Sequence, residues 1–222
     1  PSERKKYPSI RPYGVSPDLR YELIVKEYNL WLEDKEQKKQ VQLTFDGDKD
    51  YEFETANTEW LSDDGTFYLT REDKRNIRTF PLVYSLREPA PTVSEYKYEL
   101  PGDTAVLKQE LFIGNVKTGM FKKVDVVKWR GQLLEVLKVA DVQDRVFFIR
   151  KKGTRNEFEL CSVDAKTGEV KVILHEVSKP YLNEELFSCR VLNGGKDILL
   201  WSDRSGWGHY YHYDGNGKLL NA

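Results

Sequence analysis

Glu52 and Glu54 are two carboxylates that stand two positions apart in a short interval between apolar segments. Successive side chains of a β-strand point to opposite faces, so residues at i and i+2 share one face. Two carboxylates on one face can together attract an ammonium group. The pair is therefore a candidate site for an amino group. The alternative is that both side chains only line a solvated strand edge.

No residue of the sequence stands in a recognisable catalytic arrangement. Ser205 comes nearest to the Gly-x-Ser-x-Gly turn of a catalytic serine, but Asp203 stands where that turn needs its first glycine. Cys161 and Cys189 lie in apolar, strand-like surroundings, where burial raises a thiol pKa and makes the thiol inert. We predict that this chain is non-catalytic.

The histidines and cysteines do not predict a metal site or a cofactor. His209 and His212 are three positions apart, which places them on opposite faces of a strand, and no cysteine cluster supports them. The two cysteines are too few for a disulfide scaffold. They are either two buried free thiols or one bridge formed in an oxidising compartment.

The composition excludes several classes of protein. The 222 residues carry 35 basic and 36 acidic side chains, so there is no broad basic field for general nucleic-acid binding. The longest apolar runs, Val146–Ile149 and Ile198–Trp201, are far too short to span a membrane as a helix. Five Trp, 13 Tyr and 10 Phe are too many aromatics for a disordered chain.

Short alternating segments separated by turn residues predict an all-β fold. Tyr21–Val25 and Glu157–Leu160 alternate between polar and apolar residues, the pattern of a half-buried strand. Asp46-Gly47, Asn216-Gly217 and similar pairs mark turns between such segments. The mixed charge run Arg71–Arg78 is expected to be a solvated loop or hairpin.

The strand pattern repeats along residues 1–222, with units that start near residues 16, 61, 142 and 192. Steps of about 45 to 50 residues match a four-stranded blade, so we predict a partial β-propeller of about four antiparallel blades. The longer step after residue 61 implies an insertion. Residues 88–104 contain Pro89, Pro91 and Pro101, and proline removes donors from a strand ladder. We expect a long excursion there.

Several motifs together resemble the propeller of the prolyl oligopeptidase family, in its dipeptidyl peptidase IV branch. The resemblance is collinear over about residues 14–222. The motifs that carry it are Ser16-Pro17-Asp18, Asn29-Leu30-Trp31, Gln42–Gly47, Glu95–Asp103, Glu110–Val116 and Ser202–Tyr211.

The resemblance implies a larger protein with an eight-bladed propeller that caps an α/β-hydrolase domain. This chain would supply about half of the propeller, as a gate for peptides cleaved after proline or alanine near the amino terminus. The family's helix with paired glutamates has no counterpart in Asp48–Asn57, which leaves only Glu52 and Glu54 for the substrate amino group. The resemblance also places Tyr181, Leu182 and Asn183 toward the substrate cavity.

The same resemblance implies a periplasmic or secreted location, and residues 88–104 are the candidate contact of a homodimer. The sequence ends at Ala222 inside a predicted strand, which indicates a piece of a longer chain. The alternative is a stand-alone propeller that acts as a protein- or glycan-binding scaffold. Its aromatic platform would be Trp201, Trp207, Tyr210, Tyr211 and Tyr213, residues that otherwise fill the core between blades.

Overall fold

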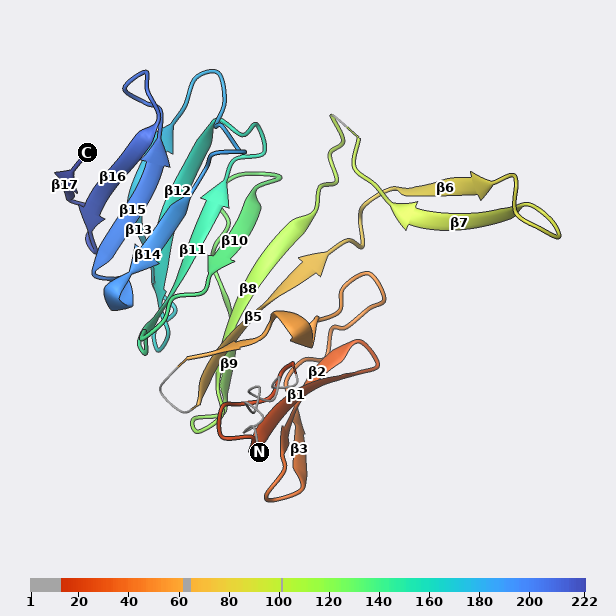
Figure 1. Cartoon of the computed structure of the whole chain (residues 1–222). Coiled ribbons are helices and arrows are strands. Elements are labelled where there is room, and N and C mark those ends of the chain that lie inside the picture. The colour runs from red at the N-terminus through yellow and green to blue at the C-terminus, as the bar shows by residue number, and fades with distance from the viewer. Residues whose placement is uncertain (1–12, 62–64, 101) are drawn as a thin grey trace, which may run out of the picture.

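The computed structural model of the chain, which describes residues 13–61, 65–100 and 102–222, is an all-β structure and confirms the predicted fold class. In these described residues, seventeen strands form four consecutive antiparallel sheets and one separate hairpin (Figure 1). The described residues contain two single 3-10 turns, η1 (Thr55–Asn57) and η2 (Asn193–Gly195), and no longer helix. No helix in these ranges is long and apolar enough to cross a membrane.

Each sheet takes its strands in chain order, as expected for propeller blades, and only the second sheet among those described is interrupted by an insertion. The first sheet is β1 (Tyr21–Lys26), β2 (Asn29–Asp34) and β3 (Lys39–Gln42). The second is β4 (Glu59–Trp60), β5 (Thr66–Asp73), β8 (Lys108–Asn115) and β9 (Met120–Val124). The third is β10 (Leu133–Leu137), β11 (Arg145–Lys151), β12 (Glu157–Asp164) and β13 (Val170–Val177). The fourth is β14 (Cys189–Leu192), β15 (Asp197–Ser202), β16 (His209–Asp214) and β17 (Leu219–Asn221).

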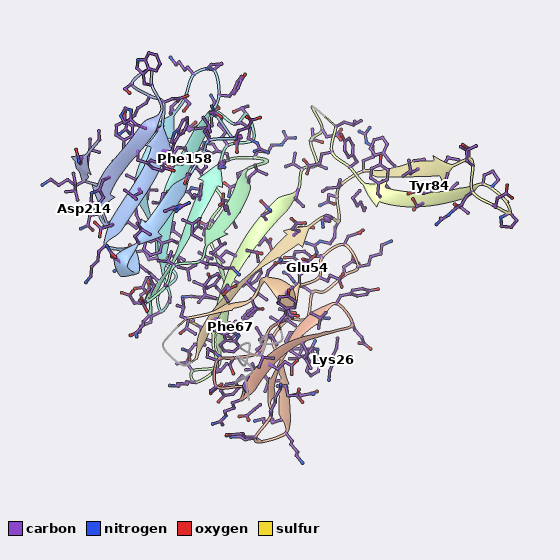
Figure 2. The ribbon with its side chains drawn as sticks, viewed as in Figure 1. Lys26, Glu54, Phe67, Tyr84, Phe158 and Asp214 are labelled. Atoms are coloured by element: carbon purple, nitrogen blue, oxygen red, sulfur yellow. The ribbon has the colours of Figure 1, made fainter. Side chains whose placement is uncertain are left out.

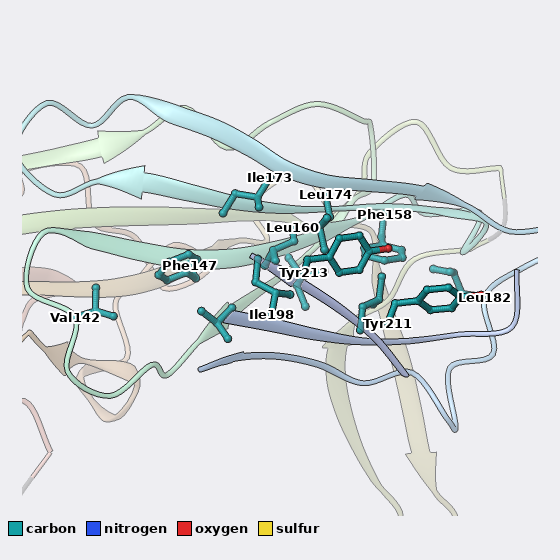
Figure 3. Packing of buried hydrophobic residues seen from close by; sticks show 13 residues of the cluster. Val142, Phe147, Phe158, Leu160, Ile173, Leu174, Leu182, Ile198, Tyr211 and Tyr213 are labelled. Atoms are coloured by element: carbon teal, nitrogen blue, oxygen red, sulfur yellow. The ribbon is translucent and has the colours of Figure 1, made fainter. Parts of the chain in front are cut away.

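The alternation of side chains along β11 supplies two separate cores. Phe147 and Ile149 pack into the cluster between the third and fourth sheets, against residues such as Ile198 and Tyr213 (Figure 3). Val146 and Phe148 point the other way, into the cluster shared with the second sheet. Both faces of this strand are therefore covered, which explains why its apolar residues form an unbroken run.

A two-stranded hairpin, β6 (Thr79–Tyr84) and β7 (Thr92–Lys97), interrupts the second sheet between β5 and β8. It extends away from the four sheets in Figure 1. Because β5 and β8 pair directly over their full length, the hairpin leaves the sheet without disturbing it. The Pro-rich residues 88–104 lie partly in this hairpin and in the connection that returns to β8, and Pro101 lies outside the described residues.

The sheets follow one another around an open arc, with the first and fourth sheets far apart (Figure 1). Among the described strands, none of the first sheet pairs with one of the fourth. The sheets contact each other through their faces: each buried cluster joins two neighbouring sheets, and within the described residues no cluster joins the first sheet to the fourth.

The two cysteines are free thiols on strands that do not bring them together. Cys161 is buried in the cluster between the second and third sheets, and Cys189 packs against the cluster between the third and fourth. Burial raises the pKa of the Cys161 thiol to about 11 and that of Cys189 to about 12. Neither thiol is poised for nucleophilic chemistry.

Candidate functional site

Glu52 and Glu54 lie in the connection from β3 to β4, which joins the first sheet to the second (Figure 2 labels Glu54). The neighbouring side chains Tyr51 and Phe53 are buried, whereas Glu52 and Glu54 are exposed. The two carboxylates therefore share one solvent-facing side, as their spacing predicts. A single 3-10 turn, η1, follows Glu54 directly.

The two carboxylates line a hollow of about 170 Å³ between this connection and strand β5. Other groups at its wall include Asn57, Thr70, Glu72, Lys74 and Gln109. Lys49 and Arg71 also line the hollow, so both acidic and basic side chains stand at its wall, and its size suits a small polar group.

The carboxylates of the pair carry no cation in the part of the chain that the structure describes. Glu54 accepts one hydrogen bond at 3.2 Å from the side-chain amide of Asn57, and neither glutamate forms an ion pair there. Lys74 is engaged instead by Glu72, at 2.7 Å. The hydrogen bond to Glu72 chiefly, and the charge of Glu54 in addition, raise the pKa of Lys74 at the same hollow, so this rim favours positively charged groups.

A buried charged residue, Arg71 on β5, underlies this connection. Its guanidinium group donates two hydrogen bonds to Asp46, at 3.0 and 3.1 Å, and lies 3.6 Å from a carboxylate oxygen of Glu110. The guanidinium carbon stacks 3.4 Å from the ring centre of Tyr51 and 4.4 Å from that of Phe53. Arg71 thus holds the residues that alternate with the two glutamates.

Electrostatics reinforce this arrangement. The hydrogen bonds from Arg71 hold the pKa of Asp46 below its usual range. The Tyr51 hydroxyl donates to Glu110 at 2.7 Å, and burial together with this bond raises the tyrosine pKa. Lys123 also binds Glu110. The charges of this network are therefore paired, and its central residue Arg71 forms part of the wall of the hollow.

The burial of Arg71 and Asp73 corrects the expectation that Arg71–Arg78 is a solvated loop or hairpin. Strand β5 continues to Asp73, and the two side chains are only 3% and 7% exposed. Their environment is set by residues distant in sequence, such as Glu110, which stands opposite Arg71 in the register of β5 with β8. The burial of Arg71 is therefore not evident from the residues around it in the sequence. The only local signal is its spacing, at i and i+2, from the buried Leu69.

Tyr181, Leu182 and Asn183 lie in the connection from β13 to β14, in a separate and wider hollow of about 740 Å³. Tyr181 and Asn183 are exposed, but the Leu182 side chain packs in the core between the third and fourth sheets. Phe53 in the β3–β4 connection bridges Arg71 near the end of β5, and Leu182 in the β13–β14 connection donates to the backbone oxygen of Arg155 just beyond β11, so both connections lie at the same end of the blades. The two hollows have no lining residue in common, so the structure does not join the two predicted segments into one site.

The aromatic residues of the fourth sheet divide between two environments. Tyr211 and Tyr213 are buried in the inter-sheet core, whereas Trp207 is 83% exposed at the turn between β15 and β16. No group of three or more potential ligands that could hold a metal ion occurs within the described ranges.

Comparison with known proteins identifies the family. Residues 4–222 match the family model described as the dipeptidyl peptidase IV (DPP IV) N-terminal region. The chain belongs to this family. The match covers nearly the whole sequence, so the DPP IV-like assignment applies to all four sheets.

Two solved structures share the fold. The crystal structure of Porphyromonas gingivalis dipeptidyl peptidase 4 superposes with a TM-score of 0.76 at 20% identity, over 95% of this chain and 32% of that one. A putative dipeptidyl aminopeptidase IV from Bacteroides ovatus gives a TM-score of 0.62 at 15% identity, over 89% of this chain and 34% of that one. The DPP IV-like chain thus spans about a third of the length of each.

Proposed function

We propose that this chain is the non-catalytic propeller part of a serine peptidase that removes short units from the amino terminus of peptides, after proline or alanine. The observation that carries the proposal is the exposed Glu52–Glu54 pair, which forms no ion pair in the described ranges, in a chain of the DPP IV N-terminal region family. The two carboxylates bind the free amino group of the peptide. Tyr181 and Asn183, exposed at the same end of the blades, contact the peptide further along.

The amino-group site selects substrates by charge. A protonated amino terminus placed about 4 Å from a carboxylate gains roughly 4 kcal/mol of Coulomb energy at an effective dielectric near 20. Desolvation removes part of this gain. A peptide with a blocked amino terminus loses the whole contribution, so the site favours free termini.

We place the catalytic residues of this peptidase in a C-terminal α/β-hydrolase domain, as the family resemblance implies. The propeller acts as a gate, because a nucleophile enclosed beneath it is reached only by short or extended peptide ends. We place the enzyme outside the cytoplasm, in the periplasm or secreted.

A homodimer contact through the hairpin and the Pro-rich residues 88–104 completes the proposal. Tyr96 and Tyr98 are exposed there and lie about 6 Å from each other and from Phe80, as measured between ring centres. A projecting hairpin with an aromatic surface suits burial against a second copy. Size-exclusion chromatography with light scattering of the full-length protein tests it, and a monomer at micromolar concentration would contradict it.

The direct test of the proposed peptidase function is the coding sequence beyond Ala222. Further blades followed by a Gly-x-Ser-x-Gly segment with downstream aspartate and histidine are expected. The full-length protein should then release a chromophore from an alanyl-prolyl substrate with a free amino terminus, and far less from its acetylated form. A stop codon after Ala222 would overturn the proposal.

The exposure of Trp207 favours one second candidate, a glycan-binding propeller. A glycan array probed with the wild-type protein and with Trp207→Ala decides between the two. Binding that depends on Trp207 supports the second candidate, and the absence of wild-type binding removes it.

A further inference from the structure

Consecutive sheets repeat one charged pair at the same place in their ladders. Arg71 on β5 stands opposite Glu110 on β8, and Arg150 on β11 stands opposite Glu159 on β12. In each sheet these two strands are the second and third in chain order. Each arginine lies near the end of its strand. All four side chains are less than a tenth exposed.

Each pair faces the preceding sheet and holds the connection that arrives from it. In the third sheet, Arg150 donates to the backbone oxygen of Val126 at 3.0 Å, and Lys128 from the same connection binds Glu159. In the second sheet, Arg71 binds Asp46, which lies just after β3 in the arriving connection. The repeated pair therefore works as a tether between neighbouring blades.

In the second sheet, the tethered connection from β3 to β4 also contains two buried aromatic residues that contact Arg71. The ring of Tyr51 contacts two guanidinium groups, whose carbon atoms lie 3.4 Å (Arg71) and 3.8 Å (Arg75) from the ring centre. Phe53 forms an isolated antiparallel bridge with the backbone of Arg71. Because Tyr51 and Phe53 are both held inward, the alternating Glu52 and Glu54 must point outward together.

We propose that Arg71, acting with Asp46, is the positioning residue that aims the Glu52–Glu54 pair at the substrate amino group. This inference rests on the amino-group site proposed above. Arg71 lines the same hollow, but its guanidinium group is engaged by Asp46 and by the rings of Tyr51 and Phe53. It fixes the backbone from which the two carboxylates project, and the equivalent Arg150 serves as an internal comparison because its connection bears no such carboxylates.

Two variants of the full-length protein test the tether. Asp46→Asn removes the charge of a side chain that is 58% exposed, so the protein should still fold. Arg71→Lys keeps the positive charge but loses the two-pronged contact. The matched control, Arg150→Lys, makes the same change in the next sheet.

Hydrogen exchange gives the first readout. We expect Asp46→Asn and Arg71→Lys to speed amide exchange in residues 48–58 about tenfold, and Arg150→Lys to speed it in residues 125–132 instead. Unchanged exchange in residues 48–58 in both variants would overturn the tether, whatever the protein's activity.

Steady-state kinetics with an alanyl-prolyl chromogenic substrate give the second readout. Both tether variants should raise KM about tenfold with kcat within about twofold, while Arg150→Lys leaves KM unchanged. If Glu52→Gln and Glu54→Gln raise KM but the tether variants do not, the positioning role is wrong and the amino-group site stands. If the glutamate variants leave KM unchanged, the amino-group site fails, and the exchange data alone decide the tether.

Discussion

The buried pair of Arg150 and Glu159 allows a quantitative test of how the blades are held together. Arg150 contacts one carboxylate oxygen of Glu159 through two nitrogens, at 2.8 and 2.6 Å, and their side chains are only 9% and 4% exposed. Replacing Glu159 with leucine leaves the guanidinium group buried without its anion. We expect this single change to lower the free energy of unfolding by about 3–5 kcal/mol.

Removing the arginine of this pair should lower the free energy of unfolding by less than removing the glutamate. Arg150→Met removes the guanidinium group, but Glu159 retains Lys128, whose side chain is 37% exposed and still reaches the carboxylate. In the double variant no buried charge is left unpaired, since Lys128 can turn to solvent. Replacement of a whole buried ion pair by apolar residues is often nearly neutral, so we expect the double variant within about 2 kcal/mol of the wild type.

A double-mutant cycle from urea unfolding, followed by tryptophan fluorescence, measures this coupling. The exposed pair of Arg145 and Asp144 is the control, and Asp144→Ala should change stability by less than about 0.5 kcal/mol. If the two single changes add up in the double variant, or if Glu159→Leu costs less than about 1 kcal/mol, the tether between the second and third sheets is not formed as described.

Three further predictions concern pH, packing and thiol reactivity. Burial raises the pKa of Glu159, but Lys128 and Arg150 overcome this and lower it below its ordinary 4.5. The ionised Glu159 therefore contributes its full stability above about pH 4.5, and this contribution is lost as the pH falls through the lower pKa of the folded state. The difference in unfolding free energy between the wild type and Glu159→Gln should narrow below about pH 4.5. A Cβ at Gly114 would lie 2.3 Å from the Phe67 ring, so Gly114→Ala should destabilise by about 1–3 kcal/mol in thermal or urea unfolding, and an unchanged midpoint would refute this contact. The buried Cys161 thiol, with its pKa raised to about 11, should resist iodoacetamide at pH 8 until the protein unfolds, as intact-mass spectrometry can show.

Local patterns in the sequence predict the strands well, because each strand must expose or bury alternate residues. The segment from Tyr21 becomes β1 and the segment from Glu157 becomes β12. The exposed side shared by Glu52 and Glu54 follows from the same periodicity.

The charged residues of the interior could not be predicted in the same way. Arg71 lies in a run of mixed charges that locally indicates a solvated turn, yet its partners are Asp46 and Glu110, 25 and 39 residues away. Burial of an arginine becomes favourable only when such distant groups neutralise it, and a local window contains no trace of them. The hairpin likewise begins at Thr79, earlier than the prolines of residues 88–104 indicate.

The amino-group site is the central claim, and one ratio tests it directly. The full-length protein should show a much higher kcat/KM for an alanyl-prolyl substrate with a free amino terminus than for its acetylated form. We predict that the double variant Glu52→Gln, Glu54→Gln lowers this ratio at least about tenfold, because two charge-assisted contacts are lost. The double variant Glu33→Gln, Glu36→Gln in the first sheet and its turn should leave the ratio unchanged. An unaltered ratio in the Glu52–Glu54 variant would contradict the account.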